Sequence, residues 1–308
     1  MPALHRYTLR FACTLLCALS LGQAHADPLD VTVSFSILGD FVRQVGGERV
    51  RVRTLVGPDE DSHAFQPRPS DVRHIAASQL VVANGLGFDD WIVRLARSSG
   101  FRGPVVIASR GARTLATGHG DHEHEHEGGT LDPHAWQDAA NARHYVANIA
   151  TALAAADPAG ATEYRARAER YSTQLQALDG EIRDTLAAIP AEKRKVVSSH
   201  DAFGHFARAY RIRFLAPVGV SNNAEPTAQG VARLIRQLRA EKVPAVFIEN
   251  VADPRLMERI RSESGARIGG TLYSDALSAS DGPAPDYVTM MRYNLHQLRT
   301  ALAPLATP

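Results

Sequence analysis

Cysteine is almost missing from this chain of 308 residues, which has two, Cys13 and Cys17. Both fall within residues 1–26, which begin with basic side chains, continue with a short apolar run and end in small residues. The apolar run is shorter than the roughly 20 residues that a transmembrane helix needs. The pattern predicts a signal peptide cleaved after Ala26 and a protein exported to the periplasm. The mature chain would then have no disulfide, thiolate ligand or cysteine nucleophile.

The chain also has no strong excess of charge of one sign. It carries 34 lysines and arginines against 33 aspartates and glutamates. Loss of Arg6 and Arg10 with the signal peptide would leave a net charge of about −1. Proteins that bind nucleic acid present a basic surface to the phosphates. We therefore expect no nucleic-acid partner.

Short β-branched runs alternate with helical stretches in two blocks of the chain, residues 27–160 and 190–308. Strands are predicted at 30–35, 51–56, 79–85, 104–109, 195–199, 212–217, 245–250 and 266–274. Such alternation is typical of parallel sheets with helices on both faces. The sequence therefore predicts an α/β protein with two lobes, each a small, mostly parallel sheet flanked by helices.

A long helical stretch separates the two blocks. One helix is predicted over 135–157 and a second over 161–189. At a rise of 1.5 Å per residue the second helix would be roughly 43 Å long, which exceeds the usual span of a lobe. Periodicity alone leaves two interpretations, a long surface helix or a rigid connector between the lobes, and Gly180 weakens the centre of the helix.

Four residues of metal-binding types follow predicted strands. His63 and His134 follow strands of the first block, and His200 and Asp275 follow strands of the second. In open α/β sheets ligands bind beyond the carboxyl ends of the strands. Three imidazoles and one carboxylate can complete the coordination of one divalent cation. Each of these residues could instead have a structural role; Asp275, for example, could be a helix N-cap. The same N-cap interpretation applies to Asp132, which lies two residues before His134.

A second group of histidines lies in "GHGDHEHEHEGG", residues 118–129. Its histidines alternate with acidic residues: His119, His122, His124 and His126. The flanking glycines predict a mobile loop. Because ordering such a loop costs entropy, it should bind metal more weakly than a preformed site. We interpret it as a secondary zinc-collecting loop; the alternative is a tolerated polar insertion.

Glu249 ends a predicted strand in "FIEN" and is a candidate to hydrogen-bond a ligand histidine from outside the coordination sphere. A structural role is the alternative. A remote alternative assigns the chain to the exported zinc hydrolases, in which three histidines leave a position for water and Glu249 acts as base. The chain lacks HExxH and GxSxG. We therefore predict that it is not an enzyme.

Several stretches resemble one known family nearly end to end: "LVGPDEDSHAFQPRPSD", "DPHAW", "VVSSHDAFGHFARAY", "FIENVADPRLMERI" and "GTLYSDALS". They resemble the solute-binding proteins of zinc and manganese ABC importers, the cluster A-I family, and within it the AztC-type periplasmic zinc-binding proteins. The resemblance implies two α/β lobes joined by one long helix, with the metal between them. It therefore favours the interpretation of the helix at 161–189 as a rigid connector between the lobes. It also assigns the ligands to His63, His134, His200 and Asp275.

The resemblance implies a binding protein that captures Zn(II) and delivers it to an ABC permease. Members that favour manganese usually carry a carboxylate at the position of His200. Three imidazoles and one carboxylate suit tetrahedral zinc better than Mn(II). A manganese-preferring protein and an exported metal buffer or chaperone remain the alternatives. We expect a monomer, with a periplasmic zinc metallochaperone as a further candidate partner.

Overall fold

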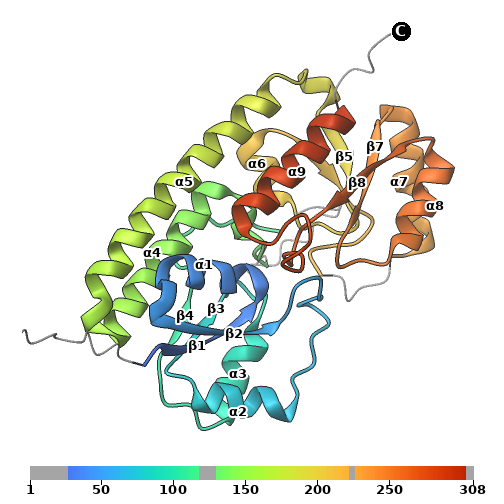
Figure 1. The fold of residues 1–308 in the computed structure, drawn as a ribbon. Helices are drawn as coiled ribbons and strands as arrows, with labels where there is room; N and C mark the ends of the chain where they lie inside the picture. The colour runs from blue at the N-terminus through green and yellow to red at the C-terminus, as the bar shows by residue number, and fades with distance from the viewer. Residues whose placement is uncertain (1–26, 118–129, 222–225, 303–308) are drawn as a thin grey trace, which may run out of the picture.

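The computed structural model describes residues 27–117, 130–221 and 226–302. Both the predicted signal peptide and the histidine-rich loop lie outside these residues. The chain forms two four-stranded parallel sheets with helices packed around them, and a long helix runs beside both (Figure 1). The predicted two-lobed α/β architecture is confirmed. No helix in the described ranges is both long and apolar enough to cross a membrane.

The N-terminal lobe is built on a sheet with the strand order β2-β1-β3-β4. Its strands are β1 (Leu29–Phe35), β2 (Val50–Val56), β3 (Leu80–Ala83) and β4 (Val105–Ile107). Its helices are α1 (Ser36–Gly46), α2 (Pro69–Ala77), α3 (Asp90–Ser98) and α4 (Ala139–Ala156). All of β3 and most of β1 are buried. Such continuous apolar strands are typical of a parallel sheet that is covered on both faces.

The C-terminal lobe repeats this topology with the order β6-β5-β7-β8. Its strands are β5 (Lys195–Val197), β6 (Arg213–Leu215), β7 (Ala245–Glu249) and β8 (Arg267–Leu272). Its helices are α6 (Gly204–Tyr210), α7 (Ala228–Glu241), α8 (Pro254–Ser264) and α9 (Tyr287–Leu302). In each sheet the first and third strands in chain order are neighbours, so the strand order reverses between them. Ligands of open α/β sheets bind at such a reversal.

The long helix is α5 (Ala161–Ala187), which contacts α1 and α4 of the N-terminal lobe and α6 and α9 of the C-terminal lobe. One side of α5 is buried at intervals of three and four residues: Tyr164, Ala168, Tyr171, Leu175, Leu178, Ile182 and Leu186. This spacing gives one apolar stripe on a helix. The connector interpretation is therefore confirmed. The exact division into 27–160, 161–189 and 190–308 remains a prediction.

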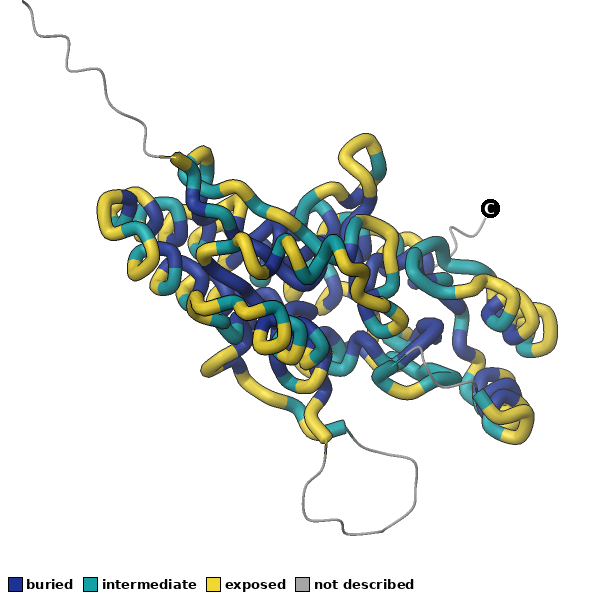
Figure 2. Tube along the Cα trace, turned by 90° about the horizontal axis from the view of Figure 1, so that it is seen from below, coloured by how far each residue is buried: buried dark blue, intermediate teal, exposed yellow. Residues whose placement is uncertain are grey.

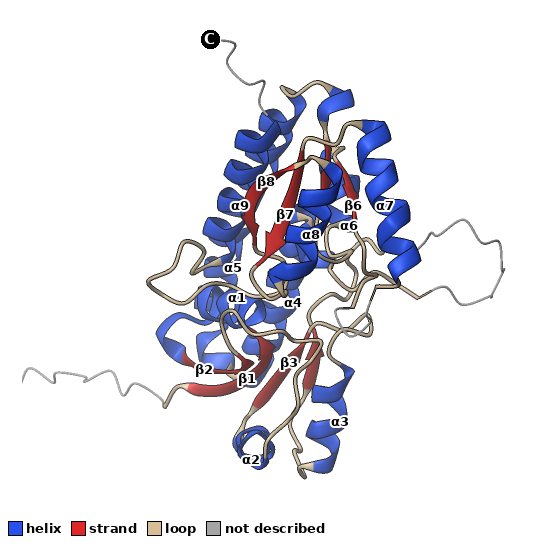
Figure 3. Ribbon diagram, turned by 90° about the vertical axis from the view of Figure 1, so that its right-hand side faces the viewer, coloured by secondary structure: helices blue, strands red, loops and turns tan. Residues whose placement is uncertain are grey.

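The two lobes share one apolar core along the side of α5. This core continues from Val33 on β1 through Leu175 on α5 to Leu298 on α9. Figure 2 shows the buried segments running through the length of the molecule. Two smaller clusters lie on the outer sides, one under α2 and α3 and one under α7 and α8. The shared core sets the two sheets one above the other, with the loops that follow their strands between them (Figure 3).

One predicted helix is divided in the structure. Within the range 135–157, a 3-10 turn at Ala135–Gln137 precedes α4, which begins at Ala139. The Asp138 carboxylate accepts a hydrogen bond from the Ala140 N–H and so caps α4. An N-cap residue has a non-helical backbone, which separates the turn from the helix. Further 3-10 turns lie at Gly47–Arg49, Pro158–Gly160 and Ala191–Lys193.

Candidate metal centre

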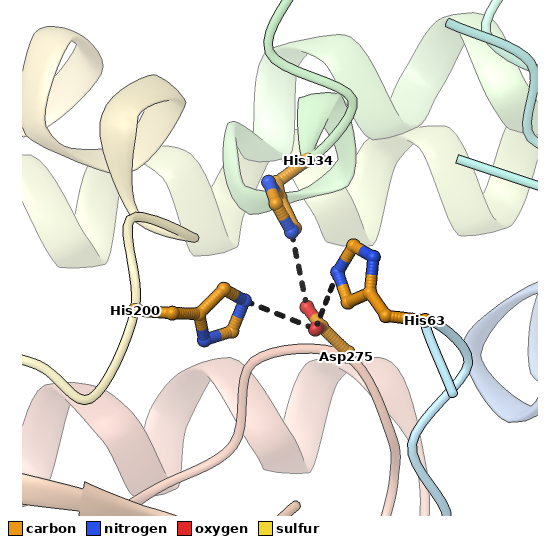
Figure 4. Close-up of side chains that lie close together, drawn as sticks. All are labelled: His63, His134, His200 and Asp275. Atoms are coloured by element: carbon orange, nitrogen blue, oxygen red, sulfur yellow. Dashed lines mark ion pairs between the residues drawn. The ribbon is translucent and has the colours of Figure 1, made fainter. Parts of the chain in front are cut away.

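Four side chains converge between the lobes, and they are the four that the sequence analysis selected. His63, His134, His200 and Asp275 each offer one ligand atom, and these atoms all lie within 4.8 Å of one another. Figure 4 shows the three imidazoles directed at the carboxylate from three sides. The residues lie in the loop after β2, ahead of the 3-10 turn before α4, after β5 and after β8.

The distances in this cluster suit a small cation. The Asp275 Oδ2 atom lies 3.3 Å from His63 Nε2 and 3.2 Å from His200 Nε2. The other carboxylate oxygen, Oδ1, lies 3.5 Å from His134 Nε2. Ligand atoms about 2.0–2.1 Å from a tetrahedral zinc would be roughly 3.3 Å apart. The three distances from the Asp275 oxygens to the imidazoles are therefore close to the spacing of donors around a tetrahedral zinc.

The cluster is buried. His134, His200 and Asp275 are fully buried and His63 is partly buried. Among the described residues, the Nε2 atoms of His134 and His200 and both Asp275 oxygens find no hydrogen-bond partner. Buried polar atoms in proteins are nearly always partnered. A divalent cation would supply the missing partner for the two Nε2 atoms and for the Asp275 carboxylate.

A local motif sets the backbone of two of the histidines. The Asp61 carboxylate accepts a hydrogen bond from the His63 N–H at 2.8 Å. The Asp132 carboxylate accepts one from the His134 N–H at 3.0 Å. In both cases an aspartate stands two residues before the histidine, as in an Asx turn. Neither aspartate was predicted as a supporting residue, although the repeated Asp-x-His spacing is a signal that could have identified both.

Asp132 also orients the ring of His134. The same Asp132 oxygen lies 2.8 Å from His134 Nδ1. A proton on Nδ1 leaves the Nε2 lone pair free for a metal. The N-cap alternative for Asp132 is wrong, because Asp138 caps α4. His205 lies outside the cluster and is buried, with its Nε2 atom 3.1 Å from the Asp132 carbonyl oxygen.

Glu249 contacts His200 with both carboxylate oxygens. Oε1 accepts a hydrogen bond from the His200 N–H at 2.9 Å, and Oε2 lies 2.8 Å from His200 Nδ1. The Ser198 hydroxyl donates to the His200 carbonyl at 2.8 Å, while Ser199 Oγ accepts from the Glu249 N–H. These contacts join the ends of β5 and β7, the neighbouring strands between which the strand order reverses. They set both the backbone and the ring of His200.

The charges of the cluster are strongly coupled. Burial alone would lower the pKa of His200, but the carboxylates of Glu249 and Asp275 outweigh burial and raise that pKa well above its ordinary value. Burial would raise the pKa of Asp275, but His200 and His134 outweigh burial and hold it well below its usual range. A metal ion entering the site therefore competes with a proton on His200.

Comparison with known proteins places this geometry in one family. The family described as zinc-uptake complex component A, periplasmic, matches residues 31–301. The manganese-binding lipoprotein MntA of Halalkalibacterium halodurans is 32% identical over 89% of this chain and 89% of its own. The iron-binding protein YfeA of Yersinia pestis is 31% identical over 86% of this chain and 84% of its own.

Solved structures agree with the sequence relatives. The periplasmic zinc-binding protein TroA from Treponema pallidum matches with a TM-score of 0.82 at 28% identity, covering 91% of this chain and 100% of that one. A Mn-bound periplasmic metal-binding protein from Candidatus Liberibacter asiaticus matches with a TM-score of 0.78 at 27% identity, over 89% and 99% of the two chains. The resemblance to the cluster A-I family is confirmed. The chain belongs to the zinc-uptake complex component A family, the cluster A-I metal-binding proteins that serve ABC importers outside the cytoplasm.

Proposed function

We propose that this protein binds one Zn(II) through His63, His134, His200 and Asp275 and delivers it to an ABC permease. The observation that carries the proposal is the convergence of three imidazoles and one carboxylate within 4.8 Å between the lobes. Nitrogen donors predominate in this set, and zinc prefers them in a tetrahedral shell. Mn(II) prefers oxygen donors and a larger coordination number.

Mn(II) is the second candidate metal, and one observation favours it. Both oxygens of Asp275 face imidazole Nε2 atoms, so the carboxylate could bind a metal through two oxygens and supply a fifth donor. Two of the similar proteins above are described as manganese-binding or Mn-bound. The choice between the two metals therefore depends on whether Asp275 binds through one oxygen or through two.

Competitive titration tests this choice. Metal-free protein comprising residues 27–308 would be titrated with Zn(II) and with Mn(II) by calorimetry against a chelator. We expect zinc to bind at least about 100-fold more tightly, with one tight site that His200→Ala removes. His144→Ala is the matched control, because His144 is exposed on α4 away from the cluster. Equal or tighter binding of Mn(II) would overturn the zinc assignment.

Capture and release, rather than catalysis, is the proposed role. A catalytic zinc keeps a coordination position for water and needs a nearby base. Glu249 is the base that a hydrolase would require, yet both of its oxygens are turned to His200. This arrangement supports a ligand-orienting role for Glu249. Metal uptake by a deletion strain separates import from a metal-buffering role, since a buffer would leave the uptake rate unchanged.

The proposal includes cleavage after Ala26 and action as a monomer. The cleavage site lies outside the described residues and rests on the sequence alone. Among the large hydrophobic side chains of the described residues, Leu131 alone is exposed, at 39%. The scarcity of exposed large hydrophobic side chains in this part of the chain supports a monomer. Zinc transfer from a periplasmic metallochaperone is also part of the proposal.

The histidine-rich loop is a secondary, weaker site in this proposal. Its four histidines lie outside the described residues, and the sequence pattern alone supports this site. Deletion of residues 119–127 should remove weak zinc equivalents and leave the tight site intact. If the tight site disappeared with the loop and survived His200→Ala, the interlobe site would be wrong.

A further inference from the structure

Asp275 belongs to the C-terminal half of the sequence, but its segment is hydrogen-bonded mainly to the N-terminal lobe. The Ser274 carbonyl accepts hydrogen bonds from Trp136 Nε1 at 2.9 Å and from Gln137 Nε2 at 2.8 Å. The two donors lie two and three residues after His134 in the chain. The peptide beside Asp275 is therefore held by the segment that carries another residue of the metal cluster.

Other residues between β8 and α9 are also hydrogen-bonded to the N-terminal lobe. The Leu277 N–H donates to Ser36 Oγ, and the Leu277 carbonyl accepts from the Asp59 N–H, both at 2.9 Å. The Tyr287 N–H donates to Asp40 Oδ2 at 3.0 Å. From the C-terminal lobe, Asn250 Nδ2 donates to the Ala276 carbonyl at a longer 3.3 Å. Within residues 274–277, the shorter of these hydrogen bonds lead to the N-terminal lobe.

The lobe to which the backbone is hydrogen-bonded changes between Tyr273 and Ser274. Both backbone polar groups of Tyr273 are bonded to the Asn294 side chain of α9, in the C-terminal lobe. The next carbonyl, on Ser274, is bonded to Trp136 and Gln137. The support of Asp275 therefore passes from one lobe to the other immediately before the carboxylate.

Gln137 makes this contact at an energetic cost. Its side chain is fully buried, and its Oε1 atom has no hydrogen-bond partner among the described residues. An unpaired buried acceptor is destabilising, and an apolar side chain of similar size would avoid that cost. The amide offsets this cost with the hydrogen bond from its Nε2 atom to the Ser274 carbonyl.

We propose that Gln137, together with Trp136, is a positioning residue that holds Asp275 on the N-terminal lobe. His63, His134 and Asp275 then form a three-ligand half-site on one body, and His200 is the ligand that the C-terminal lobe supplies. Separation of the lobes would withdraw His200 and leave the half-site assembled. The inference rests on the proposed function, because it takes Asp275 as a ligand.

A double-mutant cycle in the full mature chain tests this role. Gln137→Met removes the donor without leaving a buried unpaired acceptor, and Trp136→Phe removes the other donor while keeping an aromatic ring. Removal of groups that orient a ligand from outside the coordination sphere typically lowers metal affinity about 10–100-fold. We expect Gln137→Met to lower zinc affinity by about 10-fold or more, with an altered visible absorption spectrum of bound Co(II). Asn148→Leu, which removes two remote side-chain-to-carbonyl bonds, should change neither.

The decisive comparison adds Asp275→Ala. A residue that acts through Asp275 has no further effect once that carboxylate is gone, so Gln137→Met should leave the affinity of Asp275→Ala unchanged. Equal losses in both backgrounds would show general destabilisation and overturn the inference. Wild-type affinity and spectrum in both Gln137→Met and Trp136→Phe would also overturn it. If Asp275→Ala itself bound zinc like the wild type, the proposed ligand set would fail instead.

Discussion

His134 and His200 are supported in different ways. The ring of His134 is oriented by Asp132, two residues earlier in the same turn. The ring of His200 is oriented by Glu249, which lies 49 residues away on a neighbouring strand. The first support forms whenever its turn forms. The second exists only while β5 and β7 lie side by side.

The difference indicates which side of the site is more easily disturbed. β5 and β7 are paired in register at Val197 and Val246, and the β7–β8 ladder is irregular between Val246 and Ile248. Because Glu249 ends β7, an opening of the β5–β7 pairing would draw its carboxylate away from His200. The half-site on the N-terminal lobe should therefore stay assembled under conditions that release His200.

The largest expected effect is loss of a ligand. Either His134→Ala or His200→Ala removes one of four donors and should lower zinc affinity by more than about 100-fold, beyond the range typical of groups outside the coordination sphere. Chelator competition measures this loss, with His144→Ala as the unaffected control. A loss below tenfold in either variant would remove that histidine from the ligand set.

Loss of a supporting carboxylate should cause the next-largest decrease in zinc affinity, and the decrease should differ between Glu249 and Asp132. Glu249→Gln should lower zinc affinity by about 100-fold and Asp132→Asn by about 10-fold, within the usual range for such groups. Glu249 contacts both the N–H and the ring of its histidine across two strands, whereas the turn around Asp132 is also held by the sequence next to it. The same competition assay ranks the two variants. A larger loss in Asp132→Asn than in Glu249→Gln would contradict the conclusion that the distant support of His200 matters more than the local support of His134.

Metal removal should expose the same asymmetry. With free zinc at 1,000 times its dissociation constant, binding stabilises the folded state by about 4 kcal/mol, which raises Tm by roughly 10 °C in a chain of this size. On removal of zinc, amide hydrogen exchange should increase more at residues 197–200 than at residues 132–136. Equal increases in both segments would contradict the half-site.

The pH dependence follows from the coupled pair. The raised pKa of His200 contributes stability to the metal-free protein that is complete below about pH 6.5, the unfolded pKa, and is lost as pH rises through the folded pKa. The lowered pKa of Asp275 contributes stability above about pH 4, lost as pH falls through its folded pKa. Zinc binding at pH 7 should therefore release about one proton from His200. Calorimetry in two buffers of different ionisation enthalpy measures that release, and Glu249→Gln should reduce it.

The smallest effect is expected far from the site. Arg51 and Asp30 form an exposed ion pair at the edge of the N-terminal sheet, with exposed side-chain fractions of 64% and 43%. Exposed pairs contribute less than about 1 kcal/mol. Arg51→Gln should therefore change the free energy of unfolding only slightly and leave zinc affinity unchanged. A change in affinity would mean that the site responds to the stability of the whole lobe.

Much of the architecture was predictable because its causes are local. Short β-branched runs located all eight strands, and the long helical stretch over 161–189 predicted α5. The cluster residues were predictable because strand ends of parallel sheets meet at one edge. Whether α5 joins two lobes or covers one was open from periodicity, because a helix pattern does not say what its apolar side contacts.

The sequence by itself determined the residue types of the site and the turns that present two of them, since Asp61 and Asp132 act on histidines two residues away. Only the tertiary structure decided how the lobes share those residues. Glu249 reaches His200 through strand pairing, and Gln137 reaches the peptide before Asp275 from the other half of the chain. Such contacts depend on the packing of distant segments against one core, and no local pattern encodes that packing.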